Sequence, residues 1–280
     1  MTNLSPSSRY SLNDGNTLPV IGFGTYPLRG ATGIEAVAGA IEAGYRLIDS
    51  ALNYENEREV GEAVRRSGLD RADLQLTSKL PGRHHGFEET LASFEQSRTN
   101  LAVDYLDLYL IHWPNPSVDR FVDSFKAMIK LQSDGLVRSV GVSNFTIEHL
   151  TRLHDETGVW PSVNQVQVLP LHPQAALRAF HEQHGIITES WGPLGKDTTV
   201  VSRSIITDIA EELGVTPSQV ILRWHLQLGL LPLPKSGDPA RQRENLDVFG
   251  FELTDAHLAA IATLESDPAQ FADPNTHEEM

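Results

Sequence analysis

The chain has 280 residues, of which 40% are hydrophobic and 21% are charged, a balance typical of a globular protein. It has no cysteine, which excludes disulfides, thiolate nucleophiles and cysteine-ligated metal centres and is in keeping with a reducing, cytoplasmic compartment. A net charge of −15 repels phosphate backbones and anionic lipids, so we expect no nucleic-acid partner. No apolar run approaches about 18 residues. The start, MTNLSPSSRY, lacks the features of a secretory leader, so we expect neither membrane spanning nor export.

Apolar, strand-like runs alternate with segments of helical periodicity along the chain. In the first helical segment Ile34, Val37, Ala38 and Ile41 share one face, and Gly44 is placed to end the helix. Later faces are formed by Phe87, Leu91, Phe94 and Leu101, by Phe121, Val122, Phe125, Met128 and Ile129, and by Ile147, Leu150 and Leu153. The eight strand-like runs are 20–26, 45–50, 74–80, 107–113, 138–144, 162–167, 185–191 and 229–236. This pattern predicts an α/β fold, a closed (β/α)8 TIM barrel, as a single domain over residues 1–280.

The two ends of the chain lie outside the eight repeating units. Residues 1–19 carry Asp14 and Gly15 between short alternating runs, which is typical of a hairpin turn. We expect this N-terminal β-hairpin to plug the bottom of the barrel. The tail, residues 265–280, reads ESDPAQFADPNTHEEM, and we expect an irregular flap with a solvated acidic end and no assigned role.

Polar and aromatic side chains stand where the strands of the predicted barrel end. Active groups of such barrels lie at the carboxyl ends of the strands, so we expect these residues on one rim. A single strand-end lysine or histidine would carry little weight, because loops are generally polar, but seven strands agree. Tyr54 follows Asp49 by five positions, and its segment can also be an ordinary capped turn that begins a helix near Asn56. The strand-end residues are Asp49, Lys79, His112, Ser143, Asn144, Gln165, Trp191, Lys235 and Ser236.

Four of these side chains suit proton transfer. An ammonium group beside Tyr54 stabilises the phenolate and lowers its pKa from about 10, and we expect Lys79 to do so. Asp49 would pair with Lys79 and keep it charged in a partly desolvated pocket. His112 can donate a proton to the substrate oxygen or accept one from it. Together they predict a general acid that protonates an oxyanion, which is what a carbonyl group becomes when hydride attacks it.

The chain resembles the aldo-keto reductases from the N-terminal hairpin to Leu253. The SWGPLG stretch is similar to bacterial members that resemble 2,5-diketo-D-gluconate reductases. The resemblance implies reduction of aldehydes and ketones, including small dicarbonyls and keto sugars, to alcohols. It implies a catalytic tetrad of Asp49, Tyr54, Lys79 and His112 with Tyr54 as the proton donor. The motifs that carry it are GFGTY, LIDSALNYENEREVG, LTSKL, DLYLIHWP, GVSNF, NQVQ, SWGPLG and LPKSGDPARQRENLDVFGFEL.

The same resemblance implies an NADPH site. Trp191 would stack on the nicotinamide ring, and Ser143, Asn144 and Gln165 would bind its carboxamide and fix the orientation that hydride transfer needs. A guanidinium group suits a phosphate, so a preference for NADPH over NADH is implied. The remaining cofactor residues are Gly192 and Leu194 in SWGPLG, Lys235, Ser236 and Arg241 for the 2′-phosphate, and Glu244 and Asn245 near the adenine.

Two competing sites are rejected from residue spacing. The stretch GFGTYP begins like a dinucleotide fingerprint, but Pro27 stands where the third glycine belongs. We expect Gly22 and Gly24 instead to let the first strand pack tightly near the pocket. His84 and His85 are adjacent, so their side chains point apart in an extended segment, and no H-x-H or H-x-x-x-H pairing accompanies them. We therefore expect no metal, and a solvated loop at 81–86.

Substrate choice and assembly are less constrained. Tyr26 and Trp113 follow the first and fourth strands and would line the substrate cavity with His112, or would only shield the barrel rim. Pro81 and Gln167 depart from the family pattern, so the resemblance leaves the substrate open. A monomer is expected. The alternative function is an NADPH-binding sensor or regulatory protein with negligible turnover, and an intact tetrad argues against it.

Overall fold

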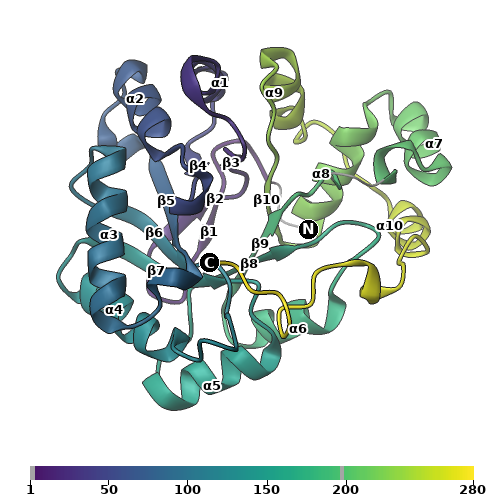
Figure 1. The fold of residues 1–280 in the computed structure, drawn as a ribbon. Coiled ribbons are helices and arrows are strands. Elements are labelled where there is room, and N and C mark those ends of the chain that lie inside the picture. Colours follow the sequence, from purple (N-terminus) through teal and green to yellow (C-terminus); the bar gives the residue numbers. More distant parts are fainter. Residues whose placement is uncertain (1–3, 196–198) are drawn as a thin grey trace.

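The computed structural model describes residues 4–195 and 199–280. Its centre is an eight-stranded parallel sheet in the order β10-β9-β8-β7-β6-β5-β4-β3 (Figure 1). Backbone hydrogen bonds of 3.1 Å from Gly22 N to Pro232 O and from Gly24 N to Pro234 O join the first strand to the last. The sheet therefore closes, and the predicted TIM barrel is confirmed. The strands are β3 Phe23–Gly24, β4 Leu47–Asp49, β5 Gln75–Leu80, β6 Leu106–Ile111, β7 Val137–Ser143, β8 Val163–Gln167, β9 Ile187–Trp191 and β10 Leu231–Leu233.

Helices surround the barrel (Figure 1). The first ends as its sequence predicts, because Gly44 takes a left-handed φ of 119° and its N–H bonds back to Ala40 O and Ile41 O. The α-helices are α1 Gly30–Ala43, α2 Glu57–Ser67, α3 Phe87–Leu101, α4 Phe121–Ser133, α5 Ile147–Thr157, α6 Ala175–Gln183, α7 Ser204–Leu213, α8 Pro217–Gln227, α9 Pro239–Leu246 and α10 Asp255–Ala262. Short 3₁₀ turns are η1 Leu52–Tyr54, η2 Arg71–Asp73, η3 Gly82–His84, η4 Val200–Ser202 and η5 Pro268–Gln270.

The N-terminal hairpin closes the lower end of the barrel. Strands β1 Arg9–Ser11 and β2 Thr17–Pro19 pair antiparallel, and Gly15 in the turn has a φ of 88°. Leu12 and Leu18 are buried against the barrel interior, which confirms the predicted plug. The apolar floor formed in this way comprises Leu12, Leu18, Leu47, Leu108, Leu110, Val163, Leu231 and Leu233.

Tight packing explains why residue 22, just before β3, is a glycine. A Cβ atom on Gly22 would lie 2.6 Å from Leu233 Cδ2 and 2.9 Å from Leu47 Cδ2, so any larger residue would displace the floor. A second apolar layer, which includes Phe94 and Phe125, lies outside the sheet under the helices.

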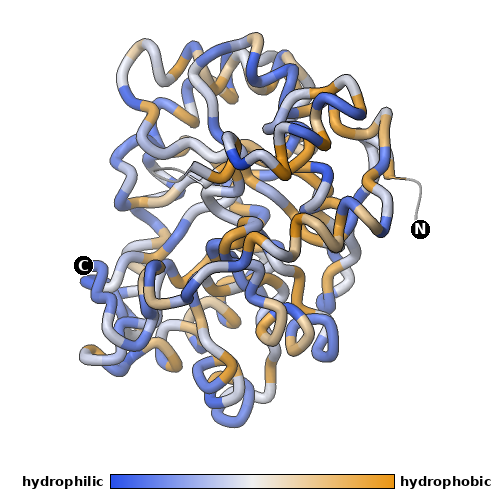
Figure 2. Tube along the Cα trace, turned by 90° about the vertical axis from the view of Figure 1, so that its right-hand side faces the viewer, coloured by the Kyte–Doolittle hydropathy of each residue, from blue (hydrophilic) through white to orange (hydrophobic). Residues whose placement is uncertain are grey.

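In Figure 2 the C-terminal end of the chain is hydrophilic. Along the residues that the structure describes, none of the helices has the length and apolar character needed to span a bilayer.

Candidate active site

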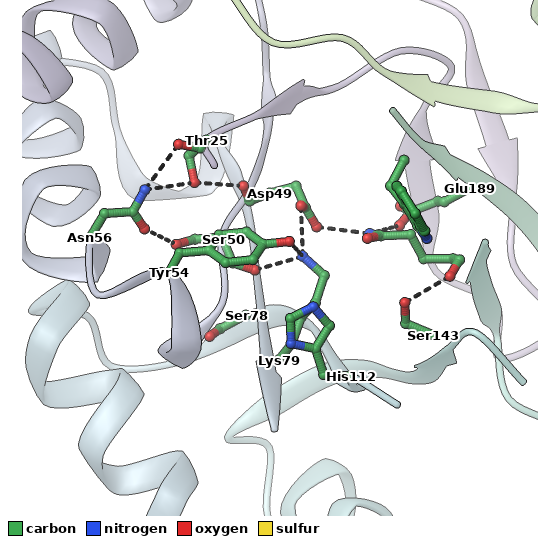
Figure 3. Close-up of polar contacts among 12 residues, drawn as sticks. Thr25, Asp49, Ser50, Tyr54, Asn56, Ser78, Lys79, His112, Ser143 and Glu189 are labelled. Atoms are coloured by element: carbon green, nitrogen blue, oxygen red, sulfur yellow. Dashed lines mark hydrogen bonds and ion pairs between the residues drawn. The ribbon is translucent and has the colours of Figure 1, made fainter. Parts of the chain in front are cut away.

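Strand periodicity brings the polar strand-end residues together above the apolar floor. Successive side chains of a strand point to opposite faces, so every second residue of a barrel strand faces inward. Leu47 of β4 and Val163 of β8 belong to the floor, and two residues later on the same strands come Asp49 and Gln165. Figure 3 shows Asp49 meeting Lys79 of the neighbouring strand, and Gln165 Nε2 donates to Asp49 Oδ1 from β8. The common rim that the sequence predicts is therefore present.

Lys79 is the centre of this cluster. Its Nζ donates to Asp49 Oδ2 at 2.7 Å, to the backbone oxygen of Ser50 at 2.9 Å and to Tyr54 OH at 3.1 Å (Figure 3). The lysine is 0% exposed. Burial alone would lower the pKa of Lys79, but the attraction of Asp49 and the contact with Tyr54 outweigh it and raise this pKa above its ordinary value. The ammonium therefore stays charged inside the protein.

The pKa of Tyr54 differs from the sequence-based expectation. Burial raises it above 10, and the nearby Lys79 ammonium, the largest opposing influence, does not reverse the effect. Asp49 adds to the rise. The expected net lowering is therefore wrong, although the expected contact is present. Tyr54 is a phenol that keeps its proton at neutral pH while touching a cation that can stabilise the phenolate.

The alternative reading of this segment, a capped turn near Asn56, also holds in part. Helix α2 begins at Glu57 with Asn56 as its N-cap, but the Asn56 side chain makes no capping bond. Its Nδ2 donates instead to Thr25 O at 3.1 Å and Leu28 O at 2.9 Å, and its Oδ1 accepts from Ser50 Oγ at 2.8 Å (Figure 3). Asn56 thus ties the loops after β3 and β4 together.

His112 faces Tyr54 from the end of β6. The two rings lie edge to face with centroids 5.6 Å apart, and the His112 backbone oxygen accepts from Asn144 Nδ2 at 3.0 Å. Burial lowers the pKa of His112, and the carboxylate of Glu279, 2.9 Å from Nδ1, opposes this lowering. The ring is therefore neutral at neutral pH. The contact also corrects one expectation, because Glu279 belongs to the acidic terminus that we expected to be solvated.

Two buried carboxyl groups share one amide. Gln165 Nε2 donates to Asp49 Oδ1 at 2.8 Å and to Glu189 Oε2 at 2.9 Å (Figure 3). Burial raises the pKa of Glu189 to about 8, with repulsion from Asp49 as a further cause. Glu189 is thus mainly protonated at neutral pH, and Asp49 is the carboxyl group that accepts from Lys79. The sequence reading did not single out Glu189, although a glutamate inside the apolar run GIITESW is an available signal.

The residues assigned to the nicotinamide end form a connected group. Trp191 Nε1 donates to Asn144 Oδ1 at 2.9 Å, and Asn144 Nδ2 also donates to Ser143 Oγ at 3.0 Å. Ser143 Oγ in turn donates to the backbone oxygen of Gln165 at 2.7 Å. Asn144 has a left-handed φ of 63°, a conformation that asparagine tolerates better than most residues. The indole of Trp191 is therefore anchored at its polar edge, and Gly192 and Leu194 follow it on the same loop.

A cavity of about 920 Å³ opens beside these residues. Its walls include Trp113, Asn144, Trp191 and, from the tail, Phe271. Trp113 also packs on His277, with ring centroids 4.0 Å apart, whereas Tyr26 is 49% exposed and lies 5.1 Å from the Tyr54 ring. Of the two aromatics expected to line a substrate cavity, Trp113 lines this one, and Tyr26 lies next to Tyr54 instead.

The residues assigned to the far end of the cofactor lie around the start of α9. Lys235 and Arg241 are exposed, and neither forms an ion pair with any residue the structure describes. Ser236 Oγ accepts from Asp238 N at 3.0 Å in the turn before the helix. Glu244 accepts from Thr216 Oγ1 at 2.8 Å, and Asn245 is buried. Lys235 and Arg241 are therefore two positive charges without an acidic partner near the N-terminus of α9, which is a suitable environment for an anion.

The loop that follows β5 differs from the expected solvated loop. His85 is 3% exposed, and burial lowers its pKa to about 4. His84 Nδ1 lies 3.0 Å from Ser93 Oγ. Within residues 4–195 and 199–280 no group of three or more histidine, aspartate or glutamate side chains is arranged to hold a metal ion.

Comparisons with known proteins agree with this architecture. The chain is 55% identical over 270 residues to 2,5-diketo-D-gluconic acid reductase B of Corynebacterium sp., covering 96% of this chain and 98% of the relative. It is 43% identical to methylglyoxal reductase DkgA of Escherichia coli (strain K12), covering 93% and 96%. The solved structure of a Gox0644 mutant in complex with NADPH superimposes with a TM-score of 0.92 at 44% identity, covering 97% and 98%. The family model described as aldo/keto reductase family matches residues 20–266, and the chain therefore belongs to the aldo/keto reductase family.

Proposed function

We propose that the protein is an NADPH-dependent reductase that converts aldehydes and ketones to alcohols, with Tyr54 as the general acid. The observation that carries the proposal is the position of Lys79 Nζ, 2.7 Å from Asp49 Oδ2 and 3.1 Å from Tyr54 OH in a buried site. A buried ammonium between a carboxylate and a phenol has no obvious structural purpose, since a buried ion pair is weak support for stability. It does stabilise the phenolate that remains after Tyr54 gives up its proton.

Each residue of the tetrad has a separate role in the proposed reduction. When bound, NADPH supplies the hydride. Tyr54 protonates the substrate oxygen as negative charge develops there, and Lys79 holds the resulting phenolate through its 3.1 Å contact. Asp49 keeps Lys79 charged, and His112, whose ring centroid lies 5.6 Å from that of Tyr54, borders the position of the substrate oxygen.

The residues present fit NADPH. Trp191 is held at its indole N–H by Asn144, which leaves its ring free for stacking, and the exposed Lys235 and Arg241 suit a phosphate. Both donor positions of Gln165 Nε2 are used by Asp49 and Glu189, so its oxygen is the atom left to accept from the nicotinamide amide. A solved relative that holds NADPH supports the same assignment.

We further propose small dicarbonyls and keto sugars as the substrate class. The names of the relatives, a 2,5-diketo-D-gluconic acid reductase and a methylglyoxal reductase, support this range. The cavity of about 920 Å³ is large enough for such compounds. We also propose that the protein works as a single-domain monomer in the cytoplasm. A monomer is supported because, among the described residues, the only large hydrophobic side chains that are exposed are Tyr26 and Met280.

The test is the oxidation of NADPH with methylglyoxal, followed for the wild type and for Tyr54→Phe. Loss of the proton donor should lower kcat by about 10² to 10⁴. The affinity for NADPH should stay within about twofold, because Tyr54 is not assigned to the cofactor. The control is Tyr105→Phe, the same substitution at the residue just before β6. The Tyr105 ring contacts Arg71 and Arg138. Equal rates for the wild type and Tyr54→Phe would refute the assigned acid, and tight NADPH binding without turnover of any carbonyl would favour a sensor.

A further inference from the structure

The last four residues of the chain lie over the tetrad. In Figure 1 the tail runs from α10 across the strand ends and finishes near the barrel axis. The Glu279 backbone oxygen accepts from Asn115 Nδ2 at 2.6 Å, and the Met280 backbone oxygen accepts from Asn53 Nδ2 at 3.1 Å. The His277 ring packs against Trp113 with the two ring planes tilted by 41°. The tail is therefore fixed to the loops that follow β4 and β6, the strands that carry Asp49 and His112.

These contacts place one carboxylate at the candidate catalytic centre. Glu279 Oε1 lies 2.6 Å from Asn53 Nδ2 and 2.9 Å from His112 Nδ1, and its side chain is only 20% exposed. The contact with His112 and the amide of Asn53 lower the pKa of Glu279 despite its burial, so the group is ionised at neutral pH. It is near enough to Tyr54 to oppose ionisation of the phenol.

Few nearby charges offset this carboxylate. Lys79 attracts Glu279 but is already paired with Asp49 at 2.7 Å, and burial keeps His112 neutral. The Arg83 guanidinium donates to Asn53 Oδ1 and forms no ion pair with Glu279. His85, which faces Glu279 from the loop after β5, is neutral because burial lowers its pKa to about 4. Glu279 is therefore a negative charge beside Tyr54 and His112 that the nearby cations do not neutralise.

We propose that Glu279 is a specificity-determining residue that disfavours carbonyl substrates carrying a negative charge near the reacting carbonyl group. Such a substrate would bring a second anion beside a partly buried carboxylate, where like charges repel more strongly than in water. A neutral aldehyde or dicarbonyl meets no such penalty. The inference rests on the proposed reductase function and, within its substrate class, ranks neutral dicarbonyls such as methylglyoxal above compounds whose carboxylate lies near the reacting carbonyl group.

The experiment compares succinic semialdehyde with its uncharged methyl ester, methyl 4-oxobutanoate, with NADPH saturating. The wild type should show a kcat/KM for the neutral ester about tenfold above that for the acid. Glu279→Ala should reduce this ratio at least about fivefold, mainly by lowering KM for the acid. The matched control is Glu278→Ala, which removes the same charge one residue earlier. The Glu278 carboxylate accepts from Ser117 N at 3.0 Å and does not touch His112, so the ratio should stay within about twofold.

A second measurement does not depend on turnover. Acetate is titrated against the NADPH-bound protein while the ring ¹⁵N signals of His112 are followed by NMR. Glu279→Ala should bind acetate several-fold more tightly than the wild type or Glu278→Ala. An unchanged ester-to-acid ratio together with unchanged acetate affinity, or a Glu279→Ala variant that discriminates more strongly against the acid, would overturn the proposal. If the wild type reduces no carbonyl compound, the proposed function fails, and the acetate titration alone decides the role of Glu279.

Discussion

Because its pKa is raised in the folded protein, Glu189 should destabilise the fold increasingly as the pH rises. Its pKa is about 8 in the folded protein, against an ordinary value of 4.5, because the side chain is fully buried and lies near Asp49. Below pH 4.5 the group is protonated in both states and contributes nothing. Between pH 4.5 and 8 only the unfolded chain releases the proton, so the unfolded state gains about 1.4 kcal/mol per pH unit. Above pH 8 the accumulated cost to folding levels off at about 5 kcal/mol.

Replacing Glu189 by glutamine keeps the shape and the contact with Gln165 but removes the titration. Urea unfolding at several pH values should show that the free energy of unfolding of Glu189→Gln rises relative to the wild type, by about 4 kcal/mol from pH 5 to pH 9. A constant offset between the two curves does not matter, because the prediction concerns their divergence. Glu211→Gln is the control, since this glutamate is exposed and should give a curve parallel to that of the wild type. Parallel curves for Glu189→Gln would refute the reasoning.

Two further substitutions probe the ion pair and the phosphate site. Lys79→Met leaves Asp49 buried and unpaired and should lower the free energy of unfolding by about 3 to 5 kcal/mol. The double variant with Asp49→Asn should recover part of this loss in urea unfolding, and no recovery would contradict the pairing. Arg241→Ala should weaken NADPH binding about tenfold or more while NADH binding is unchanged, since only NADPH carries the 2′-phosphate. Arg243→Ala on the same helix is the control for fluorescence titrations, and an equal loss of both cofactors would contradict the phosphate assignment.

The barrel and its rim could be predicted from the sequence because both follow from short-range periodicity. Alternation within a strand fixes that Asp49 lies two residues beyond Leu47 on the inward face, and Gln165 two beyond Val163. Closure of the sheet then brings β4, β5, β6 and β8 together without further information. The contact of Lys79 with Asp49 and Tyr54 is a consequence of that geometry.

The features that the sequence did not predict depend on long-range placement. Glu279 lies in a segment without helical or strand periodicity, and its contact with Asn53 spans 226 residues of sequence. His85 is polar and stands in a loop, yet the tail and the start of α4 approach it, as its interactions with Glu279 and Arg120 indicate. Burial of this kind is a property of the finished packing and has no local signature.

The raised pKa of Tyr54 is compatible with its proposed role, because proton donation makes two separate demands. Before reduction the phenol must hold its proton, and burial ensures this by disfavouring the phenolate. During reduction the proton moves to an alkoxide, which is a far stronger base than a phenolate, so transfer stays favourable even from a weakened acid. Lys79 acts at this second stage: its ammonium, 3.1 Å from the hydroxyl, attracts the new phenolate more strongly in a buried site than it would in water. The same burial that raises the pKa therefore makes the cation effective, and a Tyr54 that ionised readily at neutral pH would have no proton to give.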